Sequence, residues 1–273
     1  GDHEILDHPV RLELLAEADL DNPPRLVEHH PSLGQIERER IAPVARRGER
    51  MRPLTDTCPK PLIPAGGLPL IVWHLRALAK AGFREVIINH AWLGEQIEST
   101  LGDGSQWGLR LSYSPESSAL ETAGGIAKAL DFFQDQPFLL MNGDIWSDWD
   151  PAQALVMAER LQAGPEQAWL ILTPNPPHHP EGDFGMQEGQ LHLCAKTLAG
   201  ARSATLSGIG VYKPELFAHL PKDQPAKAAP LLHAAIERHQ VLGSLHQGFW
   251  MDVGTPERLA QLNQHLESLA PSQ

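Results

Sequence analysis

The stretch Phe138-Leu139-Leu140-Met141-Asn142-Gly143-Asp144 decides the fold that this sequence predicts. Its apolar run follows Pro137 and ends abruptly in a carboxylate. A short continuous run of this kind is typical of a strand that is buried on both faces. Ligands of open α/β sheets bind outside the carboxyl ends of such strands. We therefore expect Asp144 to reach a divalent cation or a metal-bound phosphate. The alternative is an Asp that only caps a turn.

Helix and strand patterns alternate on both sides of this stretch. Helical spacing is found over residues 69–81, 93–101 and 151–161, and further helices open at Lys227 and Pro256. Strand patterns cover residues 85–89, 110–114 and 168–173, with shorter strands between 181 and 212. Alternation at this pace indicates parallel βαβ units. The expected fold class is α/β, with a Rossmann-like doubly wound mixed sheet.

The composition excludes several classes of protein. The 273 residues and 42% hydrophobic content suffice for one large domain with at most an appendage. We see no apolar run of about 18 residues and no signal peptide, so no membrane association is expected. The two cysteines make no disulfide framework, which favours a cytoplasmic location. The net charge of -12 argues against a nucleic-acid partner.

Residues 1–40 differ in character from the rest of the chain. They mix turn signals such as Pro23-Pro24 with a run of charged residues near position 40. The leucine spacing predicts a short helix around Val10 to Ala18. We expect residues 1–40 to form a loosely packed extension, residues 41–262 the main domain and residues 263–273 a tail.

A basic segment begins at Gly48. Glycine permits close approach of the backbone to a ligand, while Arg50 and Lys60 supply positive charge in an acidic chain. Pro59 and Pro61 restrict the backbone on either side of Lys60. The segment predicts a phosphate site, and a solvated basic loop is the alternative.

Two more segments carry candidate ligand groups. Glu121-Thr122-Ala123-Gly124-Gly125 opens a predicted helix, with Thr122 as its N-cap. Glycines weaken a helix, so either a base or sugar lies against this turn or the helix packs tightly on a strand. Near the C-terminus, Trp250-Met251-Asp252 again delivers an acid at the end of an apolar run. Two acids that share one Mg²⁺ are a common way to hold a nucleoside triphosphate.

These features together resemble the sugar-1-phosphate nucleotidyltransferases. The matching segments occur in unbroken order at residues 48–51, 60–62, 121–125, 142–144, 207–209 and 250–255. The resemblance implies the nucleotidyltransferase, or glycosyltransferase-A-like, form of the doubly wound sheet, with a small β subregion for the sugar. It also implies an enzyme in which a sugar 1-phosphate attacks the α-phosphorus of a nucleoside triphosphate and pyrophosphate leaves.

The resemblance further implies roles for individual residues. Asp144 and Asp252 would hold Mg²⁺, with Arg50 on the β- and γ-phosphates and Lys60 along the α-phosphate or the sugar phosphate. Arg50, Lys60 and Asp144 are thus the implied catalytic residues. The nucleotide would meet Ala45, Gly48, Glu49, Arg50, Glu121, Gly124, Gly125 and Asn142. The sugar and its phosphate would meet Asp183, Ser207, Gly208 and Lys227.

The resemblance favours particular substrates. UTP and N-acetylmuramate 1-phosphate, used in the recycling of bacterial peptidoglycan, are favoured by the segments at 88–94, 113–116, 120–122, 182–184 and 227–232. Mannose-1-phosphate guanylyltransferases share most of the six segments above, so their activity is the alternative. The expected partners are the two substrates alone, with the chain as a monomer or a small homo-oligomer.

The sequence departs from the family pattern just before Gly48. The family opens with a buried strand that ends Leu-Ala-Ala-Gly-x-Gly, whereas Ile41-Ala42-Pro43-Val44-Ala45-Arg46-Arg47 stands here. Pro43 cannot donate a ladder hydrogen bond, and Arg46 replaces the first glycine. A shifted reading of the gene, a rebuilt first strand and a degenerate, inactive homologue are the three explanations.

Two further readings of the function follow. The departure at Arg46 leaves open a non-catalytic nucleotide- or sugar-binding protein that keeps the fold. A metal-dependent hydrolase that uses His178-His179 is the other reading, although the chain shows no further ligands at metal-binding spacing.

Overall fold

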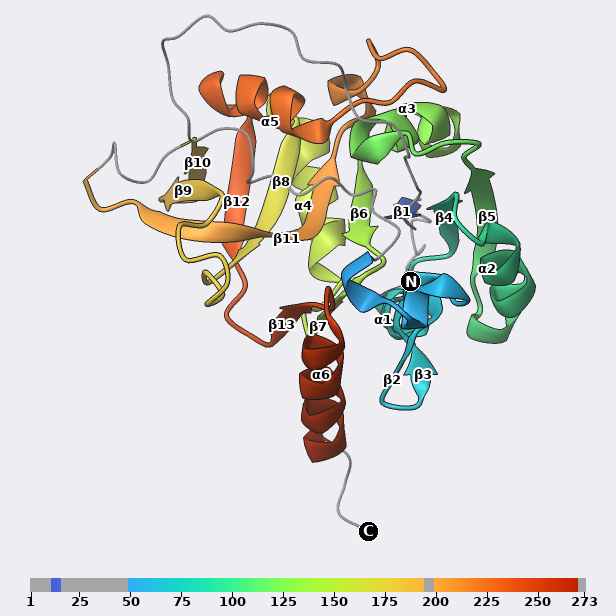
Figure 1. The fold of residues 1–273 in the computed structure, drawn as a ribbon. Helices are drawn as coiled ribbons and strands as arrows, with labels where there is room; N and C mark the ends of the chain where they lie inside the picture. The colour runs from blue at the N-terminus through green and yellow to red at the C-terminus, as the bar shows by residue number, and fades with distance from the viewer. Residues whose placement is uncertain (1–10, 16–48, 194–198, 270–273) are drawn as a thin grey trace, which may run out of the picture.

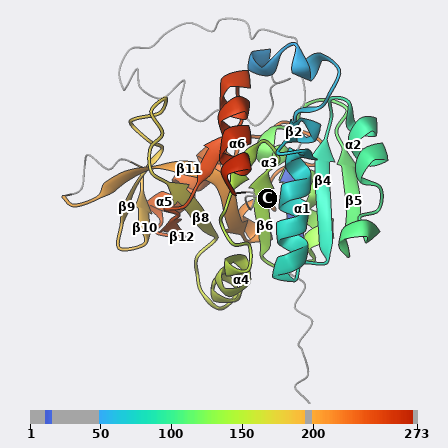
Figure 2. The ribbon, with the colours of Figure 1, turned by 90° about the horizontal axis from the view of Figure 1, so that it is seen from below.

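The computed structural model describes residues 11–15, 49–193 and 199–269 (Figure 1). Its centre is a mixed sheet of nine strands. In spatial order these are β5 (Arg110–Pro115), β4 (Glu85–His90), β1 (Arg11–Leu15), β6 (Phe138–Asn142), β11 (Arg202–Tyr212), β8 (Ala168–Thr173), β12 (Val241–Leu245), β10 (Gln190–His192) and β9 (Phe184–Gln187). Figures 1 and 2 show β5 at one edge and the β9–β10 hairpin at the other.

The sheet has a parallel and a largely antiparallel half. Strands β5, β4, β1 and β6 run parallel to one another. Strand β11 runs antiparallel to β6 and β8, and the β9–β10 hairpin adds antiparallel strands at the far end. Strand β12 is parallel to β8. The predicted doubly wound mixed sheet is therefore confirmed, with a small β region beyond β8.

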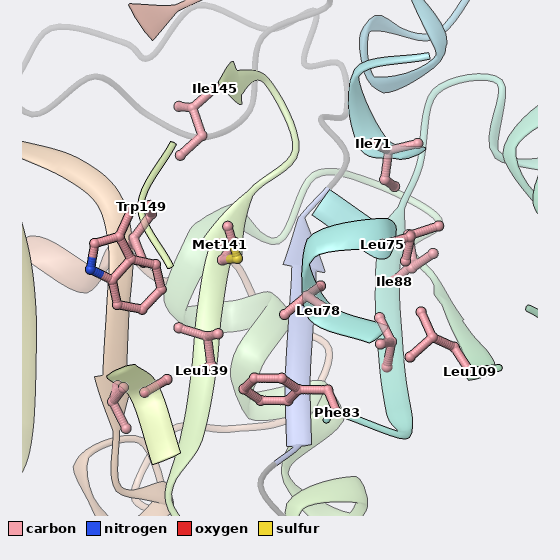
Figure 3. Packing of buried hydrophobic residues seen from close by; sticks show 14 of the residues in the cluster. Ile71, Leu75, Leu78, Phe83, Ile88, Leu109, Leu139, Met141, Ile145 and Trp149 are labelled. Carbon is pink, nitrogen blue, oxygen red and sulfur yellow. The ribbon is translucent and has the colours of Figure 1, made fainter. Parts of the chain in front are cut away.

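Helices cover both faces of the sheet. One face carries α1 (Leu70–Ala81), α2 (Gly94–Leu101) and α4 (Gln153–Ala163), and the other carries α3 (Glu121–Phe133) and α5 (Ala228–Glu237). Strand β6 serves both layers, because Leu139 and Met141 point into one cluster while Phe138 and Leu140 point into the other. Figure 3 shows Leu139 and Met141 between Trp149 and the α1 side chains. The sequence of β6 is continuously apolar because its alternate residues face opposite sides of the sheet and both sides are buried.

Strand β1 occupies the middle of the parallel half. Leu12 lies opposite Val86 of β4, and Leu14 lies opposite Met141 of β6. The helix predicted around Val10 to Ala18 is therefore wrong over these residues, since five residues with Leu12 and Leu14 in alternation also fit a strand. One piece of the predicted N-terminal extension thus belongs to the sheet. The division of the chain at residues 40 and 262 stays a prediction.

Two small sheets of two strands each accompany the large sheet. Strand β7 (Ile145–Ser147) pairs antiparallel with β13 (Trp250–Asp252), and β2 (Pro64–Ala65) pairs with β3 (Leu68–Pro69). Helix α6 (Pro256–Leu269) packs here through Leu262 and Leu266 and extends away from the large sheet (Figure 1). None of the helices in the described ranges has the length and apolar character that crossing a bilayer requires.

Candidate active site

The two strand-end acids lie on neighbouring strands. Asp144 stands between β6 and β7, and Asp252 ends β13. In the β7–β13 ladder Asp252 is opposite Ile145, and the Val253 amide donates to the Asp144 carbonyl oxygen at 3.0 Å. The fold therefore brings together the backbones of the two acids that the sequence separates widely.

Lys60 lies beside the first acid. It begins a single turn of 3-10 helix, Lys60–Leu62, and its side chain is only 8% exposed. The ammonium Nζ donates to Asp144 Oδ2 at 2.6 Å. Burying one of these charges alone would be costly, so each makes the burial of the other tolerable. The result is an ammonium group that an ion pair holds in place at the carboxyl end of β6.

The second acid has a cation of its own. Arg258 Nη1 donates to Asp252 Oδ2 at 2.8 Å, and the same nitrogen donates to His178 Nε2 at 3.2 Å. Gly254 leaves the room for this contact, because a Cβ there would lie 2.6 Å from Arg258 Nη2. Partial burial and then the Arg258 charge lower the pKa of His178. Because a guanidinium nitrogen can only donate, His178 Nε2 is the acceptor of this hydrogen bond.

Helix α6 fixes where Arg258 stands. The Thr255 hydroxyl accepts a hydrogen bond from the Arg258 amide at 3.3 Å, and Pro256 is the first helical residue. Both are favoured at a helix start, because Thr satisfies a free amide and Pro lacks one. The segment from Asp252 to Arg258 is thus closed on itself by a turn and a cap.

Arg50 lies near His178, whereas only one of the residues predicted beside it in the phosphate segment, Glu49, is described by the structure. Arg50 lies in a 3-10 turn at Glu49–Met51, is exposed, and is close enough to help lower the pKa of His178. Glu49 begins this turn. Ala45 and Gly48, together with the strand expected over 41–47, lie outside the described residues.

The start of α3 is held by the segment that precedes α5. A Cβ at Gly124 would lie 2.4 Å from the Gln224 carbonyl oxygen, and the Ala123 and Gly124 amides both donate to the Ala226 carbonyl oxygen. Tight packing therefore accounts for Gly124, although its partner is the segment before α5 and not a strand. Gly125 follows it, buried. A nucleotide contact at either glycine stays a prediction.

The predicted cap of α3 is wrong. Leu120 holds the N-cap position without a side-chain hydrogen bond, Glu121 is the first helical residue with φ +56°, and Thr122 lies inside the helix. The Leu120 amide is instead satisfied by Glu116 Oε2 at 2.9 Å. A positive φ is uncommon for a residue with a Cβ, so this turn is held by its surroundings.

Two titratable residues with shifted pKa values were given no role by the sequence reasoning. Burial raises the pKa of Glu116 to about 7, against the opposing effects of the Leu120 amide and Lys128. His74 Nε2 donates to the Ile145 carbonyl oxygen at 2.9 Å, and burial lowers its pKa to about 4. Each left a signal in the sequence: Glu116 is an acid just after a strand, and His74 is a polar residue among the apolar positions of α1.

The residues predicted for the sugar fall into two groups. Ser207 is fully buried, and its hydroxyl donates to the Ile171 carbonyl oxygen at 2.6 Å. Gly208, with φ +79°, makes room for Asn142, whose Nδ2 would lie 2.7 Å from an added Cβ. These residues therefore form the frame beside Asp144.

Asp183 and Lys227 lie farther along the molecule. Asp183 accepts hydrogen bonds from His179 Nε2 at 3.0 Å and from the Leu206 amide at 2.8 Å. Lys227 is exposed at the N-cap position of α5. Near Asp183, a cavity of about 430 Å³ is lined by Pro174, Asn175, Met186, Arg202, Ser203, Ala204, Leu245 and Gln247.

The acid pair fits Mg²⁺ by its donor type. This ion is usually bound by one or two carboxylates and completes its shell with water and substrate phosphates. Two adjacent Asp residues meet that need, even though the described part of the chain holds no cluster of three or more His, Cys, Asp or Glu side chains arranged for a metal. His178 and His179 contact different partners, Arg258 and Asp183, which removes the basis for a hydrolase built on them.

Comparison with known proteins agrees with this geometry. The model of the nucleotidyl transferase family matches residues 46–268. An N-acetylmuramate α-1-phosphate uridylyltransferase from Neisseria meningitidis is 49% identical over 80% of this chain and 93% of its own length. A mannose-1-phosphate guanylyltransferase from Mycobacterium tuberculosis is 27% identical over 84% of this chain and 65% of its own length.

A solved structure supports the fold. A protein from Bacillus anthracis, described as a glucose-1-phosphate thymidylyltransferase, superposes with a TM-score of 0.72 at 18% identity, covering 97% of this chain and 98% of that one. The family resemblance seen in the sequence is confirmed: the chain belongs to the sugar-1-phosphate nucleotidyltransferases.

Proposed function

We propose that this chain transfers the uridylyl group of UTP to a sugar 1-phosphate, with N-acetylmuramate 1-phosphate as the favoured acceptor. The products are the UDP-sugar and pyrophosphate. The observation that carries the proposal is that Asp144, in the turn before β7, lies next to β13, which ends in Asp252, and that each acid has a cation at 2.6 or 2.8 Å. The 49% identity to the Neisseria uridylyltransferase supports the choice of substrates.

The chemistry asks little covalent work of the protein. An oxygen of the sugar phosphate attacks the α-phosphorus of UTP, and the bond to the bridging oxygen of pyrophosphate breaks. Positioning of the two phosphates and neutralisation of their charge therefore account for catalysis. Lys60 holds its ammonium beside Asp144 before any substrate arrives, so little reorganisation is needed when a phosphate oxygen accepts a hydrogen bond from it.

Mg²⁺ is the proposed metal, held by Asp144 and Asp252. When bound, it would supply further neutralisation of phosphate charge. Arg50, exposed on its 3-10 turn, would bind the β- and γ-phosphates of UTP. Glu49, with Ala45 and Gly48 before it, belongs to the same proposed phosphate segment.

The base and the sugar would lie at opposite ends of the site. The uracil would meet Glu121 and the buried turn of Gly124 and Gly125, with Asn142 on the nucleotide side of Asp144. The sugar would extend toward Asp183, close to the cavity near Asn175. Lys227 would face its phosphate, and Ser207 and Gly208 would shape the floor through Asn142.

The proposal also has a cellular setting. N-acetylmuramate 1-phosphate is a peptidoglycan sugar, so we place the reaction in the bacterial cytoplasm, in the recycling of cell-wall sugars. The chain would act as a monomer or a small homo-oligomer on two diffusible substrates.

Pyrophosphate release tests the proposal. The purified chain is given UTP, N-acetylmuramate 1-phosphate and Mg²⁺, and each is omitted in turn. Release should require all three, and GTP with mannose 1-phosphate should give a lower kcat/KM. Absence of release with all four nucleoside triphosphates and several sugar 1-phosphates would contradict the proposal.

The departure at Pro43 and Arg46 favours a second candidate, a homologue that binds the nucleotide or the sugar without turnover. Thermal unfolding in the presence of UTP separates the two. A rise in Tm without pyrophosphate release would indicate the binding protein. A rise in Tm together with release would indicate the enzyme.

A further inference from the structure

We infer that Arg258 and a divalent cation compete for the Asp252 carboxylate, so that Arg258 couples loading of the acid pair to the loop that carries His178. This inference rests on the proposed function, because it takes Asp144 and Asp252 as the metal site. It assigns Arg258 as a positioning residue, which acts on the reaction through Asp252 and His178.

The contact itself has the features of a built interaction. Arg258 Nη1 lies 2.8 Å from Asp252 Oδ2, and its side chain is only 14% exposed. Gly254 lies within the same loop, where any Cβ would lie 2.6 Å from Arg258 Nη2 and 3.1 Å from Asp252 Oδ1. A methyl group at residue 254 would therefore press on the guanidinium at its present position, and the side chain would have to shift.

A chain of contacts leads from Arg258 into the sugar side of the site. The nitrogen that binds Asp252 also donates to His178 Nε2 at 3.2 Å. The next residue, His179, pairs with Asp183 Oδ1 at 3.0 Å, and Asp183 Oδ2 accepts the Leu206 amide at 2.8 Å. One guanidinium thus links an acid of the proposed metal site to the loop that ends in Asp183.

A metal ion weakens the hold of this carboxylate on the guanidinium. An ion bound at about 2.1 Å offsets the negative charge of the carboxylate and repels a nearby guanidinium. Metal loading must therefore weaken the Arg258–Asp252 bond. The released donors can turn to an incoming phosphate or carboxylate, which would draw Arg258 away from Asp252 in turn.

Linkage makes this relation reciprocal. If the sugar phosphate attracts Arg258, it must raise the affinity of the acid pair for the metal. The bound metal must then raise the affinity for the sugar phosphate by the same factor. The metal and the sugar phosphate are therefore expected to bind synergistically in the natural protein. Without Arg258 that synergy should shrink while the affinity for the metal alone rises.

Binding of Mn²⁺, measured by electron paramagnetic resonance without any substrate, tests the competition directly. R258Q removes the competing cation, and we expect it to bind Mn²⁺ about five-fold tighter than the natural protein, the factor that a partly exposed ion pair supports. G254A keeps the charge but places a methyl group against the guanidinium, and it should also bind Mn²⁺ tighter. R110Q, which removes an exposed ion pair with Glu85 on the edge strands, should leave the affinity unchanged.

Each outcome bears on the inference. Tighter Mn²⁺ binding in both R258Q and G254A supports it, as does a loss of the sugar-phosphate effect on Mn²⁺ affinity in R258Q. Tighter binding in R258Q alone would mean that charge acts at a distance, and the contact would carry no role. Unchanged or weaker binding in both folded variants, or no Mn²⁺ binding by any of the proteins, would overturn the inference.

The proposed function can fail separately. Because Mn²⁺ binding is read without turnover, a natural protein that shows the expected order of affinities but releases no pyrophosphate would overturn the reaction and leave the competition standing. Release of pyrophosphate by the natural protein, with the same Mn²⁺ affinity in R258Q, would do the reverse.

Discussion

The acid end of the site, at Asp144 and Asp252, and the base end, the start of α3 where we propose that the uracil binds, are built in different ways. At the acid end, Asp144 and Asp252 are opposed by Lys60 and Arg258, so charged side chains are already in place. At the base end, main-chain groups dominate: the Ala123 and Gly124 amides bind the Ala226 carbonyl oxygen, and Glu116 holds the turn before α3. One end is organised by side-chain charge, and the other by backbone packing.

This difference predicts how substitutions at each end affect the rate of the reaction and the stability of the protein. A change of charge at the acid end should affect the chemical step strongly, because transition-state stabilisation depends on charges fixed in advance. A change of volume at the base end should affect stability and nucleotide affinity, because a packed backbone transmits displacement. Substitutions at the acid end should therefore change mainly the rate, and substitutions at the base end mainly the stability and the affinity for the nucleotide.

The largest effect is expected from D144N. The change removes one negative charge from the acid pair and leaves the almost buried Lys60 ammonium beside a neutral amide. We expect kcat to fall by about 10³-fold, the size of effect seen when a main electrostatic contact is removed. Pyrophosphate release measures it, and D131N, at an exposed position paired with Lys222, is the control. Activity within a factor of ten of the natural protein would remove Asp144 from the catalytic role.

K60M should have the next largest effect. Its side chain has a similar length but no charge, so a phosphate at the end of β6 would lose a donor while the Asp144 carboxylate loses its ammonium. We expect about a 10²-fold loss of kcat/KM and about 1–2 kcal/mol lower free energy of unfolding. Urea unfolding and initial rates provide the two measurements. A stability loss without a kinetic one would assign Lys60 a structural role only.

Sequence patterns predicted much of this fold because its strongest signals are local. The run at 138–141 is long enough to require burial on both faces, and α1 is bounded by Pro69 and by Gly82 at φ +98°. Strands β7 and β13 span three residues each, too few for a period to appear. In β1 the leucines fit a helix and a strand equally, and only the pairing with β4 and β6 decides between them.

The residues of the site also divide into those that the sequence could predict and those that only the structure reveals. The family resemblance implied that Asp144 and Asp252 act together, and the β7–β13 ladder that brings their backbones together is too short to be recognised in the sequence. The role of Arg258 could not be predicted, because a basic residue on an amphipathic helix is expected to be exposed to solvent. Only the structure shows that its guanidinium contacts Asp252 beside Gly254. Glu116 was missed for a related reason, since its burial arises from the turn at Leu120, which is a tertiary feature.

G124A tests the base end. The added methyl group would lie 2.4 Å from a backbone oxygen, that of Gln224, and 3.0 Å from the Ala226 nitrogen, so the segment must move. We expect the free energy of unfolding to fall by about 2 kcal/mol, as for overpacking in other interiors, and the KM for UTP to rise more than kcat falls. Chemical unfolding and steady-state kinetics check both. An unchanged stability would mean that the α3 start is loosely packed and that Gly124 serves a ligand.

The smallest effect, and the most specific, concerns Glu116. Burial raises the pKa of this carboxyl from its ordinary 4.5 to about 7. Between those two pH values the unfolded chain releases the proton while the folded chain keeps it, so the contribution of Glu116 to stability is greatest below pH 4.5 and falls as the pH rises toward 7. Because the side chain is partly exposed, we expect this loss to be about 1–2 kcal/mol.

E116Q should abolish this dependence, because its amide stays neutral and can still accept the Leu120 amide. Urea unfolding of the natural protein, E116Q and the exposed-site control E159Q at pH 5, 6 and 7.5 measures the difference. The curves for the natural protein and E159Q should stay parallel, while E116Q should become relatively more stable at pH 7.5. If all three changed in parallel, Glu116 would ionise as readily in the folded chain as in the unfolded one. The turn before α3 would then be held by backbone contacts alone, and the contrast with the charged acid end would become sharper.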